Sequence, residues 1–447
     1  MTMAAEKAFP AYGNLPKSWT RRRLRFDVHL NPKKSSLDME PGELVSFVPM
    51  DAVGEYGGLN LDEVRELEEV YNGYTYFADG DLCIAKITPC FENGKGGLAE
   101  GLTNGVGFGT TELHVVRAGP SIDRRFLFYI SVADDFRKLG ESEMYGAGGQ
   151  KRIDEGFIKD WMPPLPPLDT QRRIARFLDE KTARIDALLK KKRALLDRLA
   201  EKRQALITRA VTKGLPAAAA ARAGLNPDAP LKPSGIDWLG DIPAHWEVKR
   251  LDRLTEPRRP IRYGIVLPGP HIDDGVPIIK GGDVRPERLN LDTLSRTTYE
   301  IDAAHSRSRL KVGDIVYSIR GSFGDIELLP PELDGINLTQ DAARIAPVDA
   351  VDREWLALTL KSDAVRLQMA ASAVGATIKG INIRDLRRAL LPLPPPAEQV
   401  TLKSWLKNRV SEIDRQRSLV LKSTSVLEEY RSALVTAAVT GQVRELR

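Results

Sequence analysis

Cysteine and histidine are scarce in this sequence. Its 447 residues include two cysteines, Cys83 and Cys90, and five scattered histidines. Two thiols cannot build a disulfide framework, and without a cluster of nitrogen and sulfur ligands there is no closed zinc site. We therefore expect both cysteines to be ordinary thiols and the chain to bind no metal.

Long apolar runs are also lacking. The sequence has no stretch of about 18 apolar residues that could span a membrane, and its N-terminus has no apolar signal core. These absences predict a cytoplasmic protein without membrane association. The formal net charge is only +5, and the length suits two or three domains with normal cores.

Motifs of autonomous enzymes are missing as well. The sequence contains no phosphate-binding G-x-x-x-x-G-K-S/T loop, and the dinucleotide pattern fails at 105–110 because Thr110 replaces its last glycine. A methyltransferase would need Asn or Asp before Pro-Pro and an aromatic residue, to hold the target amino group. Every Pro-Pro pair here follows Met or Leu. We therefore expect neither an ATPase nor a methylase.

The sequence does contain an extensive internal repeat. Three motifs recur exactly 228 positions apart: Leu165-Pro166-Pro167 as Leu393-Pro394-Pro395, Gln171 as Gln399, and Ala210-Val211-Thr212 as Ala438-Val439-Thr440. The globular parts repeat too, since Leu15-Pro16 before Trp19 matches Ile242-Pro243 before Trp246. The chain is therefore a duplication of a module followed by a helix.

Each repeat ends in a segment that predicts one long helix. Proline rings exclude a helix at 163–167, and neither proline nor glycine then interrupts the chain before Gly214. Such a helix is roughly 65 Å long and needs a partner, which the second copy can supply. Apolar residues share one seven-residue register in both copies: Leu178, Ile185, Leu199 and Leu206, then Leu406, Ile413, Val420, Leu427 and Leu434.

This register predicts an antiparallel intramolecular coiled coil, with Leu188, Leu195, Leu402 and Tyr430 widening its seam. The alternative is two long amphipathic helices that pack on separate cores or on other subunits. The expected fold class is α+β, with two similar strand-and-loop-rich modules related by a pseudo-two-fold axis. The expected boundaries are 1–165 for the first module, 166–214 for the central helix, 215–233 for a weakly ordered Ala/Pro-rich linker, 234–392 for the second module and 393–447 for the C-terminal helix.

Residues 234–251, which run from Ser-Gly-Ile-Asp-Trp-Leu-Gly to Trp-Glu-Val-Lys-Arg-Leu, resemble the opening of a target recognition domain in the DNA-specificity subunits of type I restriction-modification systems. The proline-rich helix entries with Gln171 and Gln399, and the Ala-Val-Thr residues that close both repeats before a glycine, are similar to that family too. The resemblance covers nearly the whole chain.

The resemblance implies that each module reads one half of a bipartite site on double-stranded DNA and that the helices set the spacer. It also implies a subunit without catalysis that binds no cofactor itself. Two modification subunits would bring S-adenosylmethionine, and restriction subunits would bring the nuclease and the ATP-driven motor with its Mg. Helix faces around 190–193 and 415–422 are candidates for docking the modification subunits.

Candidate DNA contacts lie where Arg, Lys, Asn or Gln occur on loops or strand ends, because these groups read bases or bind phosphates. Two equivalent glycine-containing loops and the ends of two equivalent strands supply them: Lys86, Gln150, Lys151, Arg152, Arg320, Lys379 and Asn382. The competing interpretation is structural turns whose charges face water.

Two other functions remain as alternatives. Asp228, Glu247 and Lys249 have the residue types of a metal-dependent DNA nuclease, but Asp228 falls in the expected linker and the first repeat has Thr20-Arg21-Arg22 at the positions matching 247–249. A coiled-coil scaffold that reads no sequence is the second alternative. It does not need two large loop-rich modules, so the sequence favours a DNA-reading subunit.

Overall fold

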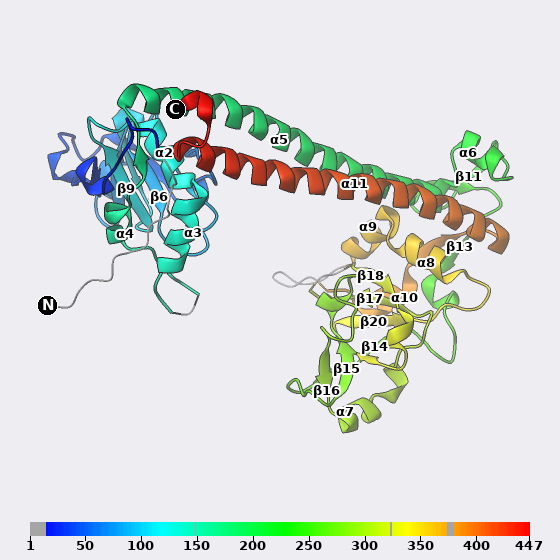
Figure 1. Ribbon diagram of the computed structural model, residues 1–447. Coiled ribbons are helices and arrows are strands. Elements are labelled where there is room, and N and C mark those ends of the chain that lie inside the picture. The colour runs from blue at the N-terminus through cyan, green and yellow to red at the C-terminus, as the bar shows by residue number, and fades with distance from the viewer. Residues whose placement is uncertain (1–14, 148, 322–323, 373–379) are drawn as a thin grey trace. The chain divides into compact units, whose positions relative to one another are not determined.

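The computed structural model describes residues 15–147, 149–321, 324–372 and 380–447. The chain divides into two compact units, of which one joins Met1–Arg193 to Leu421–Arg447 and the other is Ala194–Val420. Each unit combines one globular module with parts of two long helices, α5 (Leu168–Lys213) and α11 (Pro396–Val439) (Figure 1). Within the described residues, no helix has both the length and the apolar character to cross a membrane.

The first module contains two four-stranded sheets. Across the first sheet the strands are β2 (Val28–Leu30), β9 (Leu113–Ala118), β6 (Leu82–Ala85) and β7 (Gly96–Leu98), all antiparallel. Across the second they are β4 (Val64–Glu66), β3 (Leu44–Val48), β8 (Val106–Gly109) and β5 (Thr75–Ala78), with β3 and β8 parallel. A short pair, β1 (Thr20–Arg21) with β10 (Pro164–Leu165), brings the two ends of the module together just before α5.

The second module repeats this plan. Its antiparallel sheet runs β14 (Arg262–Tyr263), β20 (Ala342–Ile345), β17 (Ile315–Ser318), β18 (Ile326–Leu328). Its second sheet runs β16 (Ser295–Thr297), β15 (Val276–Ile279), β19 (Asn337–Leu338), again with its parallel pair, β15 and β19. The closing pair is β13 (Glu247–Arg250) with β21 (Leu390–Leu393). The predicted α+β fold with two similar modules is confirmed.

Helices of the two modules also correspond. The first module has α1 (Leu67–Val70), α2 (Arg124–Val132), α3 (Asp134–Glu143) and α4 (Glu155–Asp160), and the second has α7 (Tyr299–Ala304), α8 (Arg353–Leu360), α9 (Asp363–Ala371) and α10 (Ile383–Arg388). Asp123 caps α2 and Asp352 caps α8, because each side chain accepts a hydrogen bond from a free first-turn amide. In both units this capped helix packs between the antiparallel sheet and the long helices.

The turn that opens the central strand of each antiparallel sheet is repeated in detail. Gly80-Asp81 precedes β6 and Gly313-Asp314 precedes β17, and both glycines have positive φ values of 91° and 96°. Only glycine adopts this backbone conformation without strain. Both aspartates are buried and paired with arginine, yet Arg117 comes from β9 while Arg259 comes from the loop before β14. Both modules therefore share the turn, but the arginine that pairs with its aspartate comes from a different element in each module.

The segment between the repeats contains secondary structure, including a short helix in its alanine run, although most of its residues are exposed or half-buried. It forms α6 (Ala217–Arg222) and β11 (Leu231–Pro233), and β11 pairs with β12 (Asp241–Pro243). Ala220 is buried in the same apolar cluster as Trp246. The alanine run therefore forms a short helix with one face on the core.

The two long helices run antiparallel within each unit. In the first unit Leu178, near the start of α5, shares a core with Val435, near the end of α11. In the second unit Ile207, near the end of α5, shares a core with Leu406, near the start of α11. The predicted coiled coil is therefore present, and packing on separate cores is not the arrangement observed.

Burial along the helices follows the seven-residue register, with one correction. Seam residues Leu178, Ile185, Leu199, Leu402, Leu406 and Ile413 are buried, and Leu206, Val420, Leu427 and Leu434 are half-buried. Leu188, Leu195 and Tyr430 are exposed instead of widening the seam. On α5, Leu189 is buried and Leu196 half-buried, because alternating steps of four and three residues keep a helix face turned to its partner.

Ion pairs between the helices repeat with the sequence. In the first unit the Arg431 guanidinium lies 3.5 Å from the Asp186 carboxylate. In the second, Arg203 lies 3.2 Å from Asp414, and these residues stand 228 positions from the first pair. Partly exposed pairs contribute about 0–1 kcal/mol each, so we assign them to fixing the register more than to stability.

The repeated glutamine joins each module to the helix that follows it. The Gln171 Oε1 accepts a hydrogen bond from the Asp123 amide at 2.8 Å, and its Nε2 donates to the Pro166 carbonyl at 2.9 Å. Gln399 makes the same two contacts, with the Asp352 amide at 2.9 Å and the Pro394 carbonyl at 2.8 Å. Both glutamines are almost completely buried. One side chain thus ties the capped helix to the start of the long helix.

A repeated threonine joins each module to the other long helix. The Asp134 amide of α3 donates to the Thr436 hydroxyl of α11 at 2.9 Å. In the second unit, the Asp363 amide of α9 donates to the Thr208 hydroxyl of α5 at 3.0 Å. Each module is therefore hydrogen-bonded to both helices.

Replacing Gln171 or Gln399 with alanine should lower the free energy of unfolding by about 2 kcal/mol, because buried backbone groups would lose their partners. Chemical unfolding followed by circular dichroism measures this loss. Gln416→Ala, at an exposed position of α11, is the control and should change the value by less than about 0.5 kcal/mol. Equal stability of all three variants would contradict the anchoring role of the glutamines.

Candidate nucleic-acid interface

The candidate loop of the first module lies against the end of the central strand β6. Lys86 directly follows β6, and its carbonyl accepts a hydrogen bond from the Ile153 amide at 2.9 Å. The Thr88 amide donates to the Lys151 carbonyl at 3.0 Å. The structure thus places residues 86–88 beside residues 151–153, although the two segments are about 65 residues apart in the sequence.

Cationic side chains at this strand end are open to solvent. Lys151 and Gln150 are exposed, and Lys86 is half-buried. Within the described part of the chain, neither lysine has a carboxylate partner. Unpaired ammonium groups on a loop can bind phosphate oxygens without first breaking an internal ion pair.

Arg152 differs from its neighbours because its guanidinium is engaged within the module. Its Nε and Nη2 atoms donate to the two carboxylate oxygens of Glu112, at 2.9 Å and 2.8 Å. This hydrogen bond from Arg152 holds the pKa of Glu112 below its ordinary value. The Arg152 backbone also exchanges two hydrogen bonds with Tyr145. Arg152 therefore holds the loop in place, through its side chain on Glu112 and its backbone on Tyr145.

The equivalent strand end of the second module carries Arg320. The Ile381 amide donates to the Ile319 carbonyl at 2.9 Å, so residues 380–382 lie beside the end of β17 as residues 151–153 lie beside the end of β6. Arg320 is exposed, and its Nη1 donates a long hydrogen bond of 3.4 Å to the Gln340 Oε1. The loop comparison therefore extends to both modules.

The remaining two candidates of the second module differ from Arg320. Asn382 caps α10, since its Oδ1 accepts a hydrogen bond from the Arg384 amide at 2.9 Å. Asp154 caps α4 in the same way in the first module. The Asn382 side chain is thus used by the fold, and its assignment to DNA stays a prediction. Lys379 lies outside the described residues.

One residue beside the first loop was not singled out from the sequence. Tyr145 is 63% exposed and pairs through its backbone with Arg152. An exposed aromatic ring beside cationic groups offers a stacking surface for an unstacked base. Its signal in the sequence was weak, because a single tyrosine before a glycine is common in ordinary turns.

A metal-dependent nuclease site finds no support in the geometry. Glu247 and Lys249 pair with each other at 2.7 Å on strand β13, and Asp228 is exposed in the segment between the repeats. Among the residues that the structure describes, no three His, Cys, Asp or Glu side chains gather as metal ligands would.

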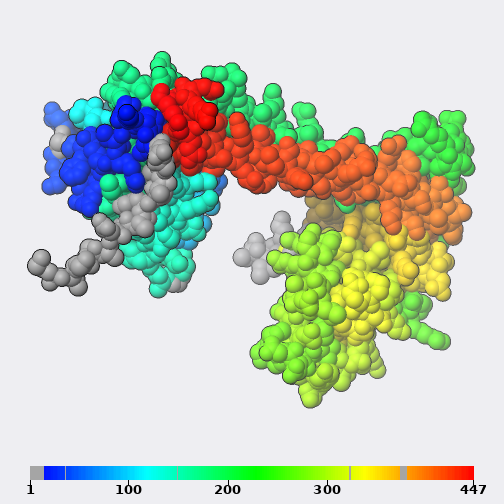
Figure 2. All heavy atoms as spheres, in the orientation of Figure 1, coloured from blue at the N-terminus to red at the C-terminus, as the bar shows by residue number. Residues whose placement is uncertain are grey.

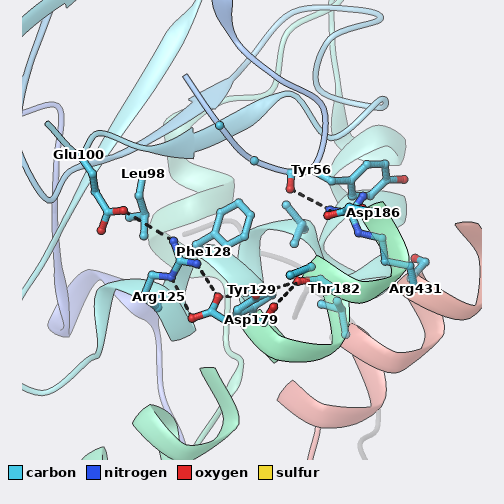
Figure 3. Close-up of a pocket in the computed structure, with 16 residues that line it drawn as sticks. Tyr56, Leu98, Glu100, Arg125, Phe128, Tyr129, Asp179, Thr182, Asp186 and Arg431 are labelled. Carbon is cyan, nitrogen blue, oxygen red and sulfur yellow. Dashed lines mark hydrogen bonds and ion pairs between the residues drawn. The ribbon is translucent and has the colours of Figure 1, made fainter. Parts of the chain in front are cut away.

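A polar cavity of about 340 Å³ lies where the first module meets the long helices (Figure 3). Figure 3 shows Arg125 of α2 and the Tyr129 hydroxyl both directed at the Asp179 carboxylate of α5; the hydroxyl donates at 2.7 Å. Across the cavity, Arg431 of α11 packs over the Tyr56 ring at 4.8 Å and donates to the Tyr56 carbonyl at 3.1 Å. The first module is thereby held to both helices by charge.

In the first unit the capping Asp123 lies 4.0 Å from Arg172 of α5, and the equivalent junction of the second module repeats this pairing of a module acid with a helix cation. There the acidic residues Asp352 and Glu354 belong to the start of α8, and the cation, Lys403, belongs to α11, at 2.5 Å and 3.6 Å. In the first module the cation Arg125 is on α2 and the acid Asp179 is on α5. The first junction thus adds an ion pair of the reverse polarity, Arg125 with Asp179, to the pair that both junctions share.

No protein-family model matches the chain. Over 162 residues it is 43% identical to the type I restriction enzyme EcoAI specificity subunit of Escherichia coli. The aligned region covers 36% of this chain and 27% of that relative. Over 444 residues it is 24% identical to the putative type I restriction enzyme MjaX specificity subunit of Methanocaldococcus jannaschii, covering 97% and 95% of the two chains. The match to the E. coli relative thus spans about a quarter of that protein's length.

A solved structure supports the same fold. This structure comes from a study of complex assembly and conformational transition of the type I R-M system. It aligns with this chain at a TM-score of 0.64 and 19% sequence identity. The match covers 96% of this chain and 99% of the other. The resemblance predicted from the repeated motifs is therefore confirmed: the relatives are type I restriction specificity subunits, and the architecture extends over nearly the whole chain.

Replacing Arg152 with alanine should lower stability at pH 7 and have less effect in acid. The ion pair lowers the pKa of Glu112, so its contribution is present above the ordinary glutamate pKa of 4.5 and is lost as the pH falls through the lowered value. Urea unfolding midpoints at pH 7 and near pH 3.5 measure the difference. Lys151→Ala should leave both midpoints unchanged, and an equal loss for Arg152→Ala at both pH values would contradict this role.

Proposed function

We propose that this relative of the type I restriction specificity subunits is a sequence-specific DNA-binding subunit, and that each module reads one half of a bipartite site on double-stranded DNA. The observation that carries this proposal is one fold built twice with a different cationic residue at the equivalent strand end, Lys86 in the first module and Arg320 in the second. A constant frame with variable polar loops suits two readers of different sequences.

The long helices set the spacer between the two half-sites in this proposal. Both α5 and α11 pass without interruption from one unit into the other. A helix advances 1.5 Å per residue, so a fixed number of residues defines a fixed length. The repeated ion pairs of Arg431 and Arg203 hold the helices in one register and so support a constant gap.

The partners proposed are two modification subunits, which bring S-adenosylmethionine, and restriction subunits, which bring ATP-driven translocation and Mg-dependent cleavage. This chain supplies no catalytic group. Support for docking on the helices comes from apolar side chains that remain exposed on α11, among them Leu419, Leu421 and Val426, beside the charged segment 415–422. Figure 2 shows α11 with one face uncovered along its length. Segment 190–193 on α5 is the second candidate.

Lys151→Ala and Lys379→Ala should each weaken duplex binding several-fold at low salt, because each removes one cation from a candidate phosphate contact. Fluorescence anisotropy with a labelled duplex, repeated over a range of salt concentrations, should give a slope of log affinity against log salt that is smaller by about one. Lys17→Ala is the matched control, since Lys17 is an exposed lysine of the same module. Unchanged affinity of both variants at low salt would rule out these contacts.

Lengthening both helices by one seven-residue repeat should lengthen the gap between the half-sites. Duplicating 191–197 in α5 and 419–425 in α11 preserves the seam register and adds about 10 Å, the length of roughly three base pairs. Methylome sequencing of a host with each version would show the half-sites and the gap. Footprinting on random DNA separates a reader from a scaffold, and an unchanged gap in an assembled complex would contradict the spacer role.

A further inference from the structure

A cavity of about 700 Å³ in the second module is lined mainly by cationic side chains. Its walls come from 258–262, 306–311, 334–335 and strand β20, and they include seven arginine or lysine side chains and one acid, Asp334. The Asp334 carboxylate already accepts a hydrogen bond from the Val312 amide at 2.8 Å. The cavity therefore has a large excess of positive charge.

Internal ion pairs neutralise only two of these cations. Arg259 pairs with Asp314, at 2.8 Å between Nη1 and Oδ1, and Arg309 pairs with Asp302, at 3.1 Å between Nε and Oδ2. The others, namely Arg258, Arg262, Arg307, Lys311 and Arg344, have no carboxylate partner within the described residues. Five like charges around one cavity repel one another, which costs stability unless an anion enters.

Arg344 is the strongest sign of a missing counter-ion. It is only 3% exposed, and its two Nη atoms donate to three backbone carbonyls, those of Pro260, Arg307 and Arg309, at 2.8–3.2 Å. Its Nε finds no acceptor in the described part of the chain. Burial, and then the nearby Arg259, lowers the pKa of the Arg344 guanidinium, while the Asp314 carboxylate, which pairs with Arg259, offsets part of this effect. A buried cation without a carboxylate partner of its own is unfavourable.

The fold does not require an arginine at this position. Arg344 faces Val316 across the central strands of its sheet, and the equivalent pair in the first module is Val115 with Cys83. Val115 is fully buried and apolar. The charge is therefore an addition to the shared frame, and a buried arginine that offers planar donors is the group best suited to hold an oxyanion.

We propose that this arginine cavity is a binding site for a phosphate group, supplied either by a DNA backbone or by a free phosphate compound. Arg262, Arg307 and the fixed Arg344 side chain line its walls. The DNA source rests on the proposed DNA-reading function, whereas the free-phosphate source does not.

The test uses the full-length protein and a double variant, Arg262→Gln with Arg307→Gln. Calorimetric titration with sodium phosphate, against sodium chloride of the same ionic strength, should show saturable binding to the wild type and at least tenfold weaker binding to the variant. Because the exchange removes mutually repelling cations, the melting temperature without phosphate should stay the same or rise. Arg253→Gln, an exposed arginine of the same module outside the cavity, is the control and should bind phosphate within twofold of wild type.

A second arm identifies the source. If the DNA backbone enters the cavity, the double variant should bind a non-specific duplex at least threefold more weakly than wild type, and free phosphate should compete. If a free phosphate compound is the ligand, duplex affinity should equal that of wild type while phosphate binding is lost. Wild-type heats with phosphate identical to those with chloride, together with unchanged duplex affinity of the variant, would overturn the proposal. Lys151→Ala tests DNA reading separately, so failure of one proposal does not imply failure of the other.

Discussion

The buried glutamine at the start of each long helix determines where a module can sit. Gln171 and Gln399 each bond the amide of a helix-capping aspartate and a proline carbonyl, and these groups would be unsatisfied in any other placement. Thr436 and Thr208 add a bond from the same module to the opposite helix. A module therefore docks completely only when both helices are paired, which couples folding of the globular parts to formation of the coiled coil.

Duplication explains why these contacts are reciprocal. One ancestral arrangement of helix and module, used twice with the helices antiparallel, gives each module its own helix start and the other helix's end. Charges at the two junctions have since diverged: Arg125 meets Asp179 in one unit, and Asp352 meets Lys403 in the other. One contact is kept, because the capping aspartates Asp123 and Asp352 each pair with a cation of the following helix, Arg172 and Lys403.

The repeated frame could be predicted from sequence because it depends on backbone rules. Proline runs, a seven-residue register and positive-φ glycines leave local signals, and so the helices and the duplication were found. The second row of the seam was misplaced, since Leu188 and Leu189 are equally apolar and only the partner decides between them. The candidate site was harder because its contacts are non-local. Nothing near Arg152 in the sequence reveals Glu112, and an asparagine such as Asn382 suits a helix cap as well as a base contact.

Differences between the modules fall where the frame does not constrain them. The strand that carries buried Val115 in one module carries Arg344 in the other, while the sheet order stays the same. An arginine is tolerated inside this module because three carbonyls from two separate segments converge on it, those of Arg307 and Arg309 and that of Pro260. Since anchoring depends on the glutamine and threonine contacts, the distal parts of a module are free to acquire new charge. The same separation lets one scaffold carry two modules with different surface charges without disturbing the helices that join them.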